Sequence, residues 1–476
     1  MRHERSHTKV IATIGPASGD RETLEQMIQE GVDVFRINFS HGTHETHLKT
    51  IRIIHGLNEE YDSHVAILAD LQGPKLRIGE MENGVAELED GAEFLFTTTP
   101  CKGNSTMAFI SYNELPRDVK AGEMILVDDG KLEFEILETN GKDSVRCRVI
   151  HGGALSDHKG VNLPHTKVSL PSLTEKDILD ANFALDHGAD LIALSFVRKE
   201  KDIRDLRELI RAHPGKAHVI AKIEKPEALE EIEQIIDATD GIMVARGDLG
   251  VEVEFQRVPL IQKHLIKMCT EKSKPVIVAT QMMESMITNP TPTRAEANDV
   301  ANAVLDGADA VMLSGETSIG KYPVQTIHNM QMIIDSTEEE AFPFYRIHTP
   351  RKESKTFLPD SICYNAVRLA EQVNAAAIIT LTNSGYTAVR ISSHRPGAHI
   401  FTFTENRELI PHLSLVWGVR AFYFAECTNI NDYFDYTEEF LVGKNLLRKG
   451  DLVVHIGSIP IGGKGKTNMM KLTRVT

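Results

Sequence analysis

Eight short runs of apolar and β-branched residues recur along the N-terminal part of the chain. They occupy residues 10–15, 34–40, 65–71, 191–197, 219–224, 241–249, 275–282 and 310–317. Nearly continuous apolar runs of this length are typical of strands that are buried on both faces. The pattern therefore predicts eight buried strands.

Amphipathic helical patterns lie between most of these runs. Leu24, Met27 and Ile28 share one helix face and precede Gly31, a residue that favours a helix end. Thr293 and Glu296 have capping-box spacing and predict a helix start after the seventh run. Eight strands alternating with helices predict an α/β fold of the (β/α)8 TIM-barrel type.

One spacing between runs is too long for a loop. The third run ends near residue 71 and the fourth begins near residue 191, whereas loops inside compact domains are short. The intervening segment has short alternating runs, and Asp129-Gly130 within 126–132 is a hairpin signal. We therefore predict an inserted, β-barrel-like lid domain after strand three, standing over the barrel.

A proline-containing, charged stretch at 342–359 marks a second boundary. Beyond it, helix and strand patterns alternate again, with a helix at 361–373 and strands at 376–382, 399–404 and 452–458. The expected domains are a barrel formed by 1–73 and 171–345, the lid at 74–170, and a C-terminal α/β regulatory domain at 346–476.

Composition limits the partners and the compartment. The formal net charge of -16 argues against nucleic acid or an anionic membrane as the main partner. The five cysteines are scattered and form no C-x-x-C pair, which favours a reducing compartment. No run of 18 apolar residues occurs. We expect a cytoplasmic protein.

Polar residues gather where the predicted strands end. In barrels these C-terminal ends, here called the barrel mouth, carry the active site. The mouth residues are Arg36, Asn38, Ser40, His41, Asp70, Ser195, Lys222, Glu224, Asp248, Thr280, Gln281 and Glu316. A single acid at a strand end is more often a cap or a salt-bridge partner, but a core gains nothing from so many polar residues together.

The residue types indicate a chemistry. Glu224 and Asp248 offer the oxygen ligands that suit Mg²⁺ or Mn²⁺. Arg36 and Lys222 supply positive charge for a phosphoryl group in transfer or a developing enolate. Thr280 could hold a water that relays a proton. The expected substrate is therefore anionic, in a locally basic pocket of an acidic protein.

At these residues the chain resembles the pyruvate kinase family over essentially its whole length. The resemblance rests on ATIGPAS, FRINFSHG, DLQGPKLR, HKGVNLP, ALSFVR, AKIEKPEAL, IMVARGDLGVE, ATQMMESM, the segment 292–317 and GKYP. Taken jointly, these motifs are very specific. The resemblance implies transfer of a phosphoryl group from phosphoenolpyruvate to ADP, giving pyruvate and ATP in the last step of glycolysis.

The family's residue roles transfer to matching positions. Lys222 corresponds to the lysine that stabilises the transition state, and Glu224 and Asp248 to the divalent-metal ligands. The positions that correspond to phosphoenolpyruvate contacts are Arg36, Gly247, Asp248 and Thr280, and those that correspond to nucleotide contacts are His41, Arg77 and Lys159. The resemblance also implies a homotetramer with allosteric regulation.

One motif departs from the common family pattern. Many members bind K⁺ through residues matching Asn38, Ser40, Asp70 and the next position, and carry a glutamate where this chain has Lys75. Here the position after Asp70 is Leu71, which brings no side-chain oxygen. Our hypothesis is that the Lys75 ammonium substitutes for K⁺, so that the enzyme works without this ion.

A second anion site is expected in the C-terminal domain. Thr382, Asn383, Ser384, Gly385 and Thr387 follow a predicted strand and open a helix, an arrangement that suits a phosphorylated effector. Asn383 and Tyr386 stand where family members often have basic residues, which disfavours fructose 1,6-bisphosphate. A sugar monophosphate or a nucleotide remains open, with residues 462–468 as further donors.

Two other functions compete with the kinase. A Mg²⁺-dependent, enolate-stabilising lyase of the aldolase type could use the same mouth, but it needs no nucleotide lid carrying Arg77 and Lys159. A catalytically silent sensor would not need the set Arg36, Lys222, Glu224, Asp248 and Thr280. Two weaker motifs indicate no further function. The spacing of His41, His44 and His47 favours a helix face over a metal site. Residues 462–467 lack the residue order of a P-loop.

Overall fold

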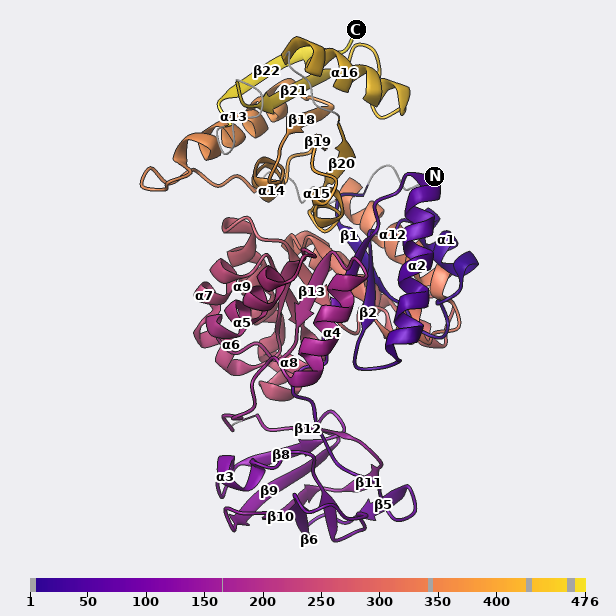
Figure 1. Cartoon of the computed structure of the whole chain (residues 1–476), viewed down its shortest axis with the longest axis vertical. Helices are drawn as coiled ribbons and strands as arrows, with labels where there is room; N and C mark the ends of the chain where they lie inside the picture. Colours follow the sequence, from indigo (N-terminus) through magenta and orange to yellow (C-terminus); the bar gives the residue numbers. More distant parts are fainter. Residues whose placement is uncertain (1–5, 165, 341–345, 425–429, 460–466) are drawn as a thin grey trace.

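The computed structural model describes residues 6–164, 166–340, 346–424, 430–459 and 467–476. Three parts follow one another along its longest axis (Figure 1). The C-terminal domain and the lid lie at opposite ends of a central barrel. One end of the barrel therefore faces the lid, and the other end faces the C-terminal domain.

The barrel is a closed ring of eight parallel strands, so the predicted fold is confirmed. Around the ring they are β1 (Lys9–Thr13), β2 (Val34–Asn38), β3 (Ala66–Asp70), β13 (Leu191–Leu194), β14 (His218–Ile223), β15 (Gly241–Ala245), β16 (Val276–Ala279) and β17 (Ala310–Leu313). Each predicted run overlaps one of these strands, although β1 and β14 begin one residue before their runs. Every strand ends before its run does, because the last residues of each run turn into the mouth.

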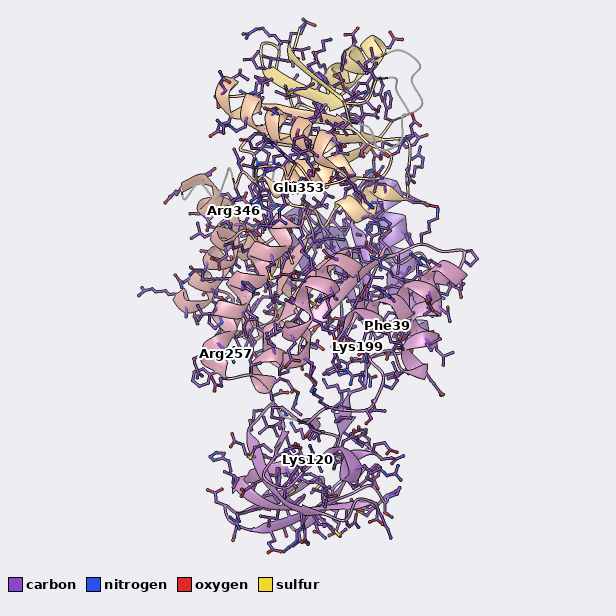
Figure 2. All side chains as sticks on the ribbon, turned by 90° about the vertical axis from the view of Figure 1, so that its left-hand side faces the viewer. Phe39, Lys120, Lys199, Arg257, Arg346 and Glu353 are labelled. Carbon is purple, nitrogen blue, oxygen red and sulfur yellow. The ribbon has the colours of Figure 1, made fainter. Side chains whose placement is uncertain are left out.

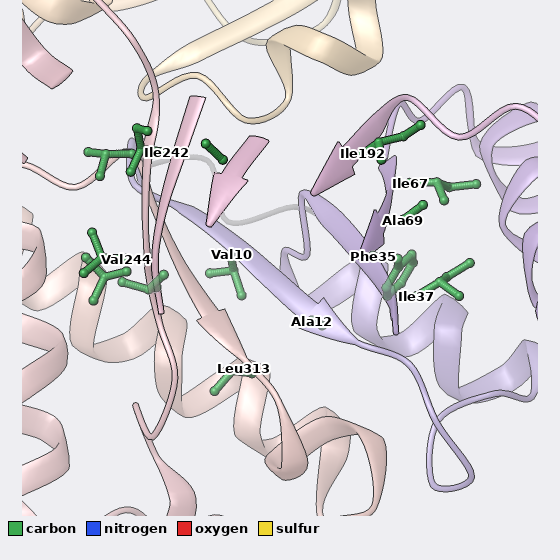
Figure 3. Packing of buried hydrophobic residues seen from close by; sticks show 14 of the residues in the cluster. Val10, Ala12, Phe35, Ile37, Ile67, Ala69, Ile192, Ile242, Val244 and Leu313 are labelled. Atoms are coloured by element: carbon green, nitrogen blue, oxygen red, sulfur yellow. The ribbon is translucent and has the colours of Figure 1, made fainter. Parts of the chain in front are cut away.

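Alternation along each strand explains the apolar runs. In β1, Ile11 packs inside the ring with Val34 and Ala310, whereas Val10 and Ala12 join the outer core beneath the helices. Figure 3 shows this outer packing around Phe35, with Ile37 close by. The strands are therefore largely apolar on both faces, except near the mouth, where Arg36, Asp70 and Lys222 occur.

Helices cover the ring and begin and end at the expected signals. α1 (Arg21–Glu30) ends at Gly31, whose φ of 111° is a backbone conformation that glycine adopts at little cost. α10 (Arg294–Asp306) starts with the predicted capping box of Thr293 and Glu296. The other barrel helices are α2 (His44–Tyr61), α4 (Glu175–Asp186), α5 (Glu200–Ala212), α6 (Pro226–Glu230), α7 (Ile232–Ala238), α8 (Arg246–Glu252), α9 (Val258–Glu271), α11 (Gly315–Ser318) and α12 (Pro323–Glu340).

The lid is a β domain inserted between β3 and β13. Its main sheet has seven strands in the order β4 (Leu76–Arg77), β12 (Gly160–Asn162), β8 (Met124–Val127), β9 (Leu132–Thr139), β10 (Ser144–His151), β6 (Glu93–Thr97) and β7 (Met107–Phe109). β5 (Val85–Leu88) and β11 (Gly153–Ser156) form a second sheet, and α3 (Leu115–Asp118) lies between β7 and β8. The predicted hairpin is confirmed, since Val127 pairs with Leu132.

The lid sits over the mouth. Figure 1 places β12 on the side of the lid nearest the barrel and β10 on the far side. Figure 2 shows Phe39, which follows β2, and Lys199, near the end of β13, on the half of the barrel nearest Lys120 of the lid. The C-terminal ends of the barrel strands therefore point toward the lid.

The C-terminal domain is an α/β layer, as predicted, but larger in its sheet. The strands run β20 (Val419–Tyr423), β19 (His399–Thr404), β18 (Ala377–Leu381), β21 (Leu452–Gly457) and β22 (Met469–Arg474). The helices are α13 (Phe357–Val373), α14 (Tyr386–Ser393), α15 (Leu409–Leu413) and α16 (Ile430–Gly443). β20 and β22 were not predicted, because both are partly exposed and lack a continuous apolar run.

This domain closes the other end of the barrel. Leu415 packs among the inward residues of the strands, next to Ile11 and Leu191. Arg395 donates to Asp309 at 3.0 Å, and its guanidinium lies 4.9 Å from the Trp417 ring. Apolar and ionic contacts therefore cover this end of the ring, and the opposite end faces the lid.

Candidate active site

Three barrel strands bring two cations onto one buried carboxylate. Arg36, in β2, donates from Nε to Asp70 at 2.6 Å and from a terminal nitrogen to Thr13 at 2.9 Å. Lys222, in β14, lies 3.0 Å from the other Asp70 oxygen. All three side chains are almost fully buried. The mouth therefore contains a fixed cluster of positive charge around Asp70.

Lys222 is the centre of this cluster. Its Nζ donates to the Ser195 hydroxyl at 2.7 Å and lies 3.0 Å from Glu224. Burial alone would lower the pKa of Lys222, but the carboxylates of Asp70 and Glu224 outweigh it and raise the pKa above its usual value. The ammonium therefore stays charged and aimed by three oxygen partners.

Glu224 and Asp248 form a pair of carboxylates that suits a divalent cation. Burial and the nearby Asp248 raise the pKa of Glu224, and Lys222 opposes that shift. The second Glu224 oxygen accepts from the Phe196 amide at 2.8 Å. Two mutually repelling carboxylates gain most from a cation between them, and Mg²⁺ commonly takes one or two carboxylates plus water and substrate oxygens. Across the described residues no group of three or more His, Cys, Asp or Glu gathers to hold a metal.

Asp248 lies on a helix, which corrects the predicted strand to residue 249. β15 ends at Ala245, and α8 begins at Arg246 with Asp248 in its first turn. The change from strand to helix was hidden because the N-cap position holds Ala245, which offers no capping side chain. The helix start aims Gly247 and Asp248 into the mouth.

Gly247 and Thr280 are in direct contact. The Gly247 amide donates to the Thr280 hydroxyl at 3.1 Å. A Cβ at position 247 would lie 2.8 Å from that hydroxyl oxygen, closer than carbon and oxygen normally approach. Glycine is required here by this close approach. The two residues line one side of the mouth together.

A cleft separates the mouth from the lid. Its lining includes Lys75, Asn162 and Arg198, with Lys225 and Asp248 on the barrel side. Arg198 donates to the backbone carbonyls of Val168 and Leu170, which holds the returning connection of the lid. The cleft is therefore lined by several cations next to the carboxylate pair.

Of the three predicted nucleotide contacts, Arg77 and Lys159 are sequence neighbours of the cleft-lining residues Leu76 and Gly160, and none of the three lines the cleft itself. Arg77, in β4, donates to the His158 carbonyl at 2.8 Å, and Lys159 donates to Asp128 at 2.8 Å. Burial and the cations Lys75, Arg77 and Arg36 lower the pKa of His41, which favours the neutral imidazole. The positive field that acts on His41 would also attract a polyphosphate.

The residues predicted for a monovalent ion are engaged with the chain. Asn38 accepts from the Ser40 amide at 3.0 Å. Both oxygens of Asp70 face Arg36 or Lys222. Lys75 is exposed and lines the cleft.

Four of the predicted effector residues, 382–385, directly precede α14, and Thr387 lies in its first turn. The Thr382 hydroxyl accepts from the Gly385 amide at 3.1 Å, and the Thr387 hydroxyl lies 2.9 Å from that of Thr467. Asn383 and Ser384 are exposed. Of the predicted donors at 462–468, residues 462–466 lie outside the described residues.

Some mouth residues turn out to have structural roles, and others were missed. Glu316 is in α11 and is buried, accepting from the Met283 amide at 3.1 Å and the Ser314 amide at 2.7 Å, so it caps backbone instead of facing a ligand. Lys225 and Glu252 form a buried ion pair at 2.7 Å that no sequence pattern indicated. The one sequence signal that could have found them is their position: Lys225 directly follows Glu224, and Glu252 lies four residues after Asp248.

The histidines of the spacing 41, 44 and 47 have other partners. His44 bonds Asp180 at 2.7 Å and stacks on Phe183. His47 packs against Phe39.

Among the described helices, none combines the length and apolarity needed to cross a membrane.

Comparison with known proteins agrees with this geometry. Residues 5–327 match the family model "Pyruvate kinase, barrel domain", and residues 360–473 match "Pyruvate kinase, alpha/beta domain". The pyruvate kinase of Geobacillus stearothermophilus is 43% identical over 470 residues, covering 98% of this chain and 80% of the relative. That of Clostridium perfringens is 41% identical over 480 residues, covering 98% and 99%.

A solved structure extends the likeness to three dimensions. The crystal structure of a pyruvate kinase from Cryptosporidium parvum superposes with a TM-score of 0.91 at 36% identity, covering 99% of this chain and 97% of that one. These matches give no support to an aldolase-type lyase. The chain is a phosphotransferase and belongs to the pyruvate kinase family.

Proposed function

We propose that the barrel mouth transfers a phosphoryl group from phosphoenolpyruvate to ADP, giving pyruvate and ATP. The observation that carries this proposal is the placement of Lys222, whose ammonium contacts Asp70, Glu224 and Ser195 in a buried mouth. A fixed cation beside two metal-binding carboxylates matches the charge that develops as the enolate leaves.

Binding is assigned to residues on four strand ends. Arg36 and the Gly247 amide would hold the carboxylate and phosphate of phosphoenolpyruvate. Glu224 and Asp248 would hold Mg²⁺ or Mn²⁺, which when bound neutralises phosphate charge and draws substrate oxygens together. Asp70 keeps Arg36 and Lys222 in place through its ion pairs.

Lys222 and Thr280 are assigned to the chemical steps. The Lys222 ammonium faces the oxygen that becomes negative when the phosphoryl group departs, and it stabilises that charge electrostatically. The resulting enolate needs a proton at its third carbon. The Thr280 hydroxyl, at the mouth beside Gly247, is placed to orient a water that delivers this proton.

The lid is assigned to the nucleotide. His41, Arg77 and Lys159 would contact the phosphates of ADP, and Arg77 and Lys159 adjoin residues that line the cleft between lid and barrel. Closure of the lid would exclude water, so that the phosphoryl group passes to ADP and not to solvent.

The test is a direct product assay. Purified protein with phosphoenolpyruvate, ADP and Mg²⁺ should form pyruvate and ATP in equal amounts, and omission of ADP should abolish both. Turnover without ADP, or carbon-carbon cleavage of a pyruvate adduct, would contradict the proposal and favour a lyase.

We also propose that the enzyme does not require K⁺. Leu71 offers no side-chain oxygen, Asp70 is already paired with Arg36 and Lys222, and the Lys75 side chain lines the cleft. Replacing K⁺ by Na⁺ or a tetraalkylammonium ion should leave the rate nearly unchanged, whereas Lys75→Glu should create activation by K⁺. A collapse of the wild-type rate without K⁺ would refute this.

A phosphorylated effector is proposed at the turn before α14. Asn383 and Ser384 are exposed and directly precede the start of a helix, a place that favours an anion. Sugar monophosphates and nucleotides should be titrated at low phosphoenolpyruvate concentration with wild type and Ser384→Ala. Kinetics that no compound changes would reject an effector at this place.

Assembly and location are further expectations from the family. A homotetramer predicts a mass near four chains in light scattering, and a monomer would contradict it. A cytoplasmic enzyme predicts recovery of the activity in the cytosolic fraction of lysed cells.

A further inference from the structure

Lys225 and Glu252 form a buried ion pair beside the cleft. The Lys225 Nζ donates to Glu252 Oε1 at 2.7 Å, and the side chains are 11% and 1% exposed. The other Glu252 oxygen is buried and has no hydrogen-bond partner in the part of the chain that the structure describes. The charge of Glu252 therefore depends on very few contacts.

The pair joins the two segments that carry the carboxylates of the mouth. Lys225 directly follows Glu224 at the end of β14. Glu252 lies four residues after Asp248 in α8, and residues four apart occupy the same helix face one turn apart. The ion pair thus links the backbone next to one carboxylate with the helix turn next to the other.

The lid reaches the same carboxylate oxygen. Asn162, the last residue of β12, donates from Nδ2 to Glu252 Oε1 at 2.9 Å. β12 pairs with β4, so the two strands that adjoin the barrel connections lie together in the lid sheet. A displacement of the lid therefore acts directly on Glu252.

We propose that Lys225 and Glu252 are a positioning pair that fixes the spacing of Glu224 and Asp248 for the divalent cation, and that Asn162 couples this spacing to lid position. The inference deepens the proposed function, because it assigns the regulation of that metal site. Neither residue of the pair acts on the reacting atoms. A movement of the lid would change the metal site through the hydrogen bond from Asn162 to Glu252.

A purely structural role makes a different prediction. Replacing a buried ion pair by apolar side chains of similar volume is often neutral or stabilising. The double variant Lys225→Met/Glu252→Met should therefore fold and melt at or above the wild-type midpoint. If the pair only stabilises the fold, metal affinity should be unaffected in this variant.

Metal affinity of the free protein tests the positioning role without turnover. Mn²⁺ binding, followed by the loss of free-ion electron paramagnetic resonance, should weaken by about tenfold in the double Met variant, the usual effect of disturbing groups behind metal ligands. Wild-type affinity in a folded double variant would overturn the proposal. Absence of Mn²⁺ binding by the wild type would instead contradict the proposed metal site itself.

Asn162→Ala tests the coupling to the lid and leaves the barrel intact. Losing a hydrogen bond to the buried Glu252 carboxylate should weaken Mn²⁺ binding and raise KM for ADP, each by about tenfold. Backbone amides of 160–162 should also exchange faster with deuterium. Arg146→Ala is the control. Arg146 lies in β10, on the side of the lid away from the barrel, and its ion pairs are with Glu93 in β6 and Glu138 in β9. Asn162→Ala kinetics and exchange equal to those of the control would overturn the coupling.

Discussion

Replacing Asp70 by asparagine removes the charge that holds Arg36 and Lys222 in the barrel mouth. The substitution keeps the side-chain shape but leaves Arg36 without its ion-pair partner and Lys222 with Glu224 alone. Asp70 is 1% exposed, with Arg36 at 2.6 Å and Lys222 at 3.0 Å. Breaking one buried ion pair in this way typically costs about 3–5 kcal/mol of stability.

The lower end of that range sets the expected thermal shift. About 3 kcal/mol lowers the melting midpoint of a domain of barrel size by roughly 6–12 °C. The rate should fall as well, because Arg36 and Lys222 lose the group that orients them. We expect kcat to drop by about a hundredfold, the effect of displacing catalytic groups by about 1 Å.

The pH dependence follows from the sign of the pKa shift. Burial disfavours the ionised form of Asp70, but Arg36 and Lys222 outweigh it and hold the pKa below its ordinary value of 3.8. The ionised carboxylate therefore contributes its stability above the ordinary pKa and loses it as the pH falls through the lower, native pKa. The difference between wild type and Asp70→Asn should be constant from about pH 5 to 8 and should shrink below about pH 4.

Differential scanning fluorimetry at several pH values measures the shift. Glu138→Gln is the matched control, since it neutralises one partner of an exposed ion pair with Arg146 in the lid, and exposed pairs contribute little. The control should melt like the wild type. An Asp70→Asn midpoint equal to that of the control at pH 7 would refute the view that this carboxylate organises the mouth.

Two further substitutions test other parts of the molecule. Gly247→Ala would place a Cβ 2.8 Å from the Thr280 hydroxyl, so kcat should fall by at least about tenfold. The control is Gly443→Ala, where the added atom meets nothing within 4 Å, and it should have wild-type kinetics. Equal rates for the two variants would contradict the steric argument. Burial, with Arg390 and His348 nearby, lowers the pKa of His394 to about 3. Because the unfolded histidine takes up a proton below about pH 6.5 and the native one does not, each such group costs about 2 kcal/mol of stability between pH 6.5 and 5. Urea midpoints at these two pH values should therefore differ less in His394→Asn than in the wild type, and an unchanged difference would exclude His394 as a contributor.

The sequence predicts the barrel well because its signals are local. Each strand is an uninterrupted apolar run, and helix ends such as Gly31 and the Thr293 cap follow from the conformations of single residues. The mouth was predictable for a related reason. A polar residue at the end of such a run, Glu224 for example, has no role in the core and stands out.

Features that depend on distant parts of the chain could not be read in this way. Leu415 closes the far end of the barrel although it lies in a different domain. The partner of Lys225 is 27 residues away, and the Asn162 contact with Glu252 spans 90 residues. The start of α8 was missed because its N-cap position holds Ala245, which offers no capping side chain. The other features are determined by tertiary contacts and not by local preference.

Lys222→Met tests the central claim most directly, because it removes the ammonium and keeps most of the side-chain volume. Wild type and variant should be compared by pyruvate formation in a coupled assay, and by phosphoenolpyruvate binding in isothermal titration calorimetry with Mg²⁺ present. We predict that turnover falls by at least about a thousandfold, as when a transition-state charge loses its main electrostatic partner, while binding stays measurable. Turnover at the wild-type rate in a variant that binds phosphoenolpyruvate would contradict the assignment of Lys222 as the cation that stabilises the departing enolate.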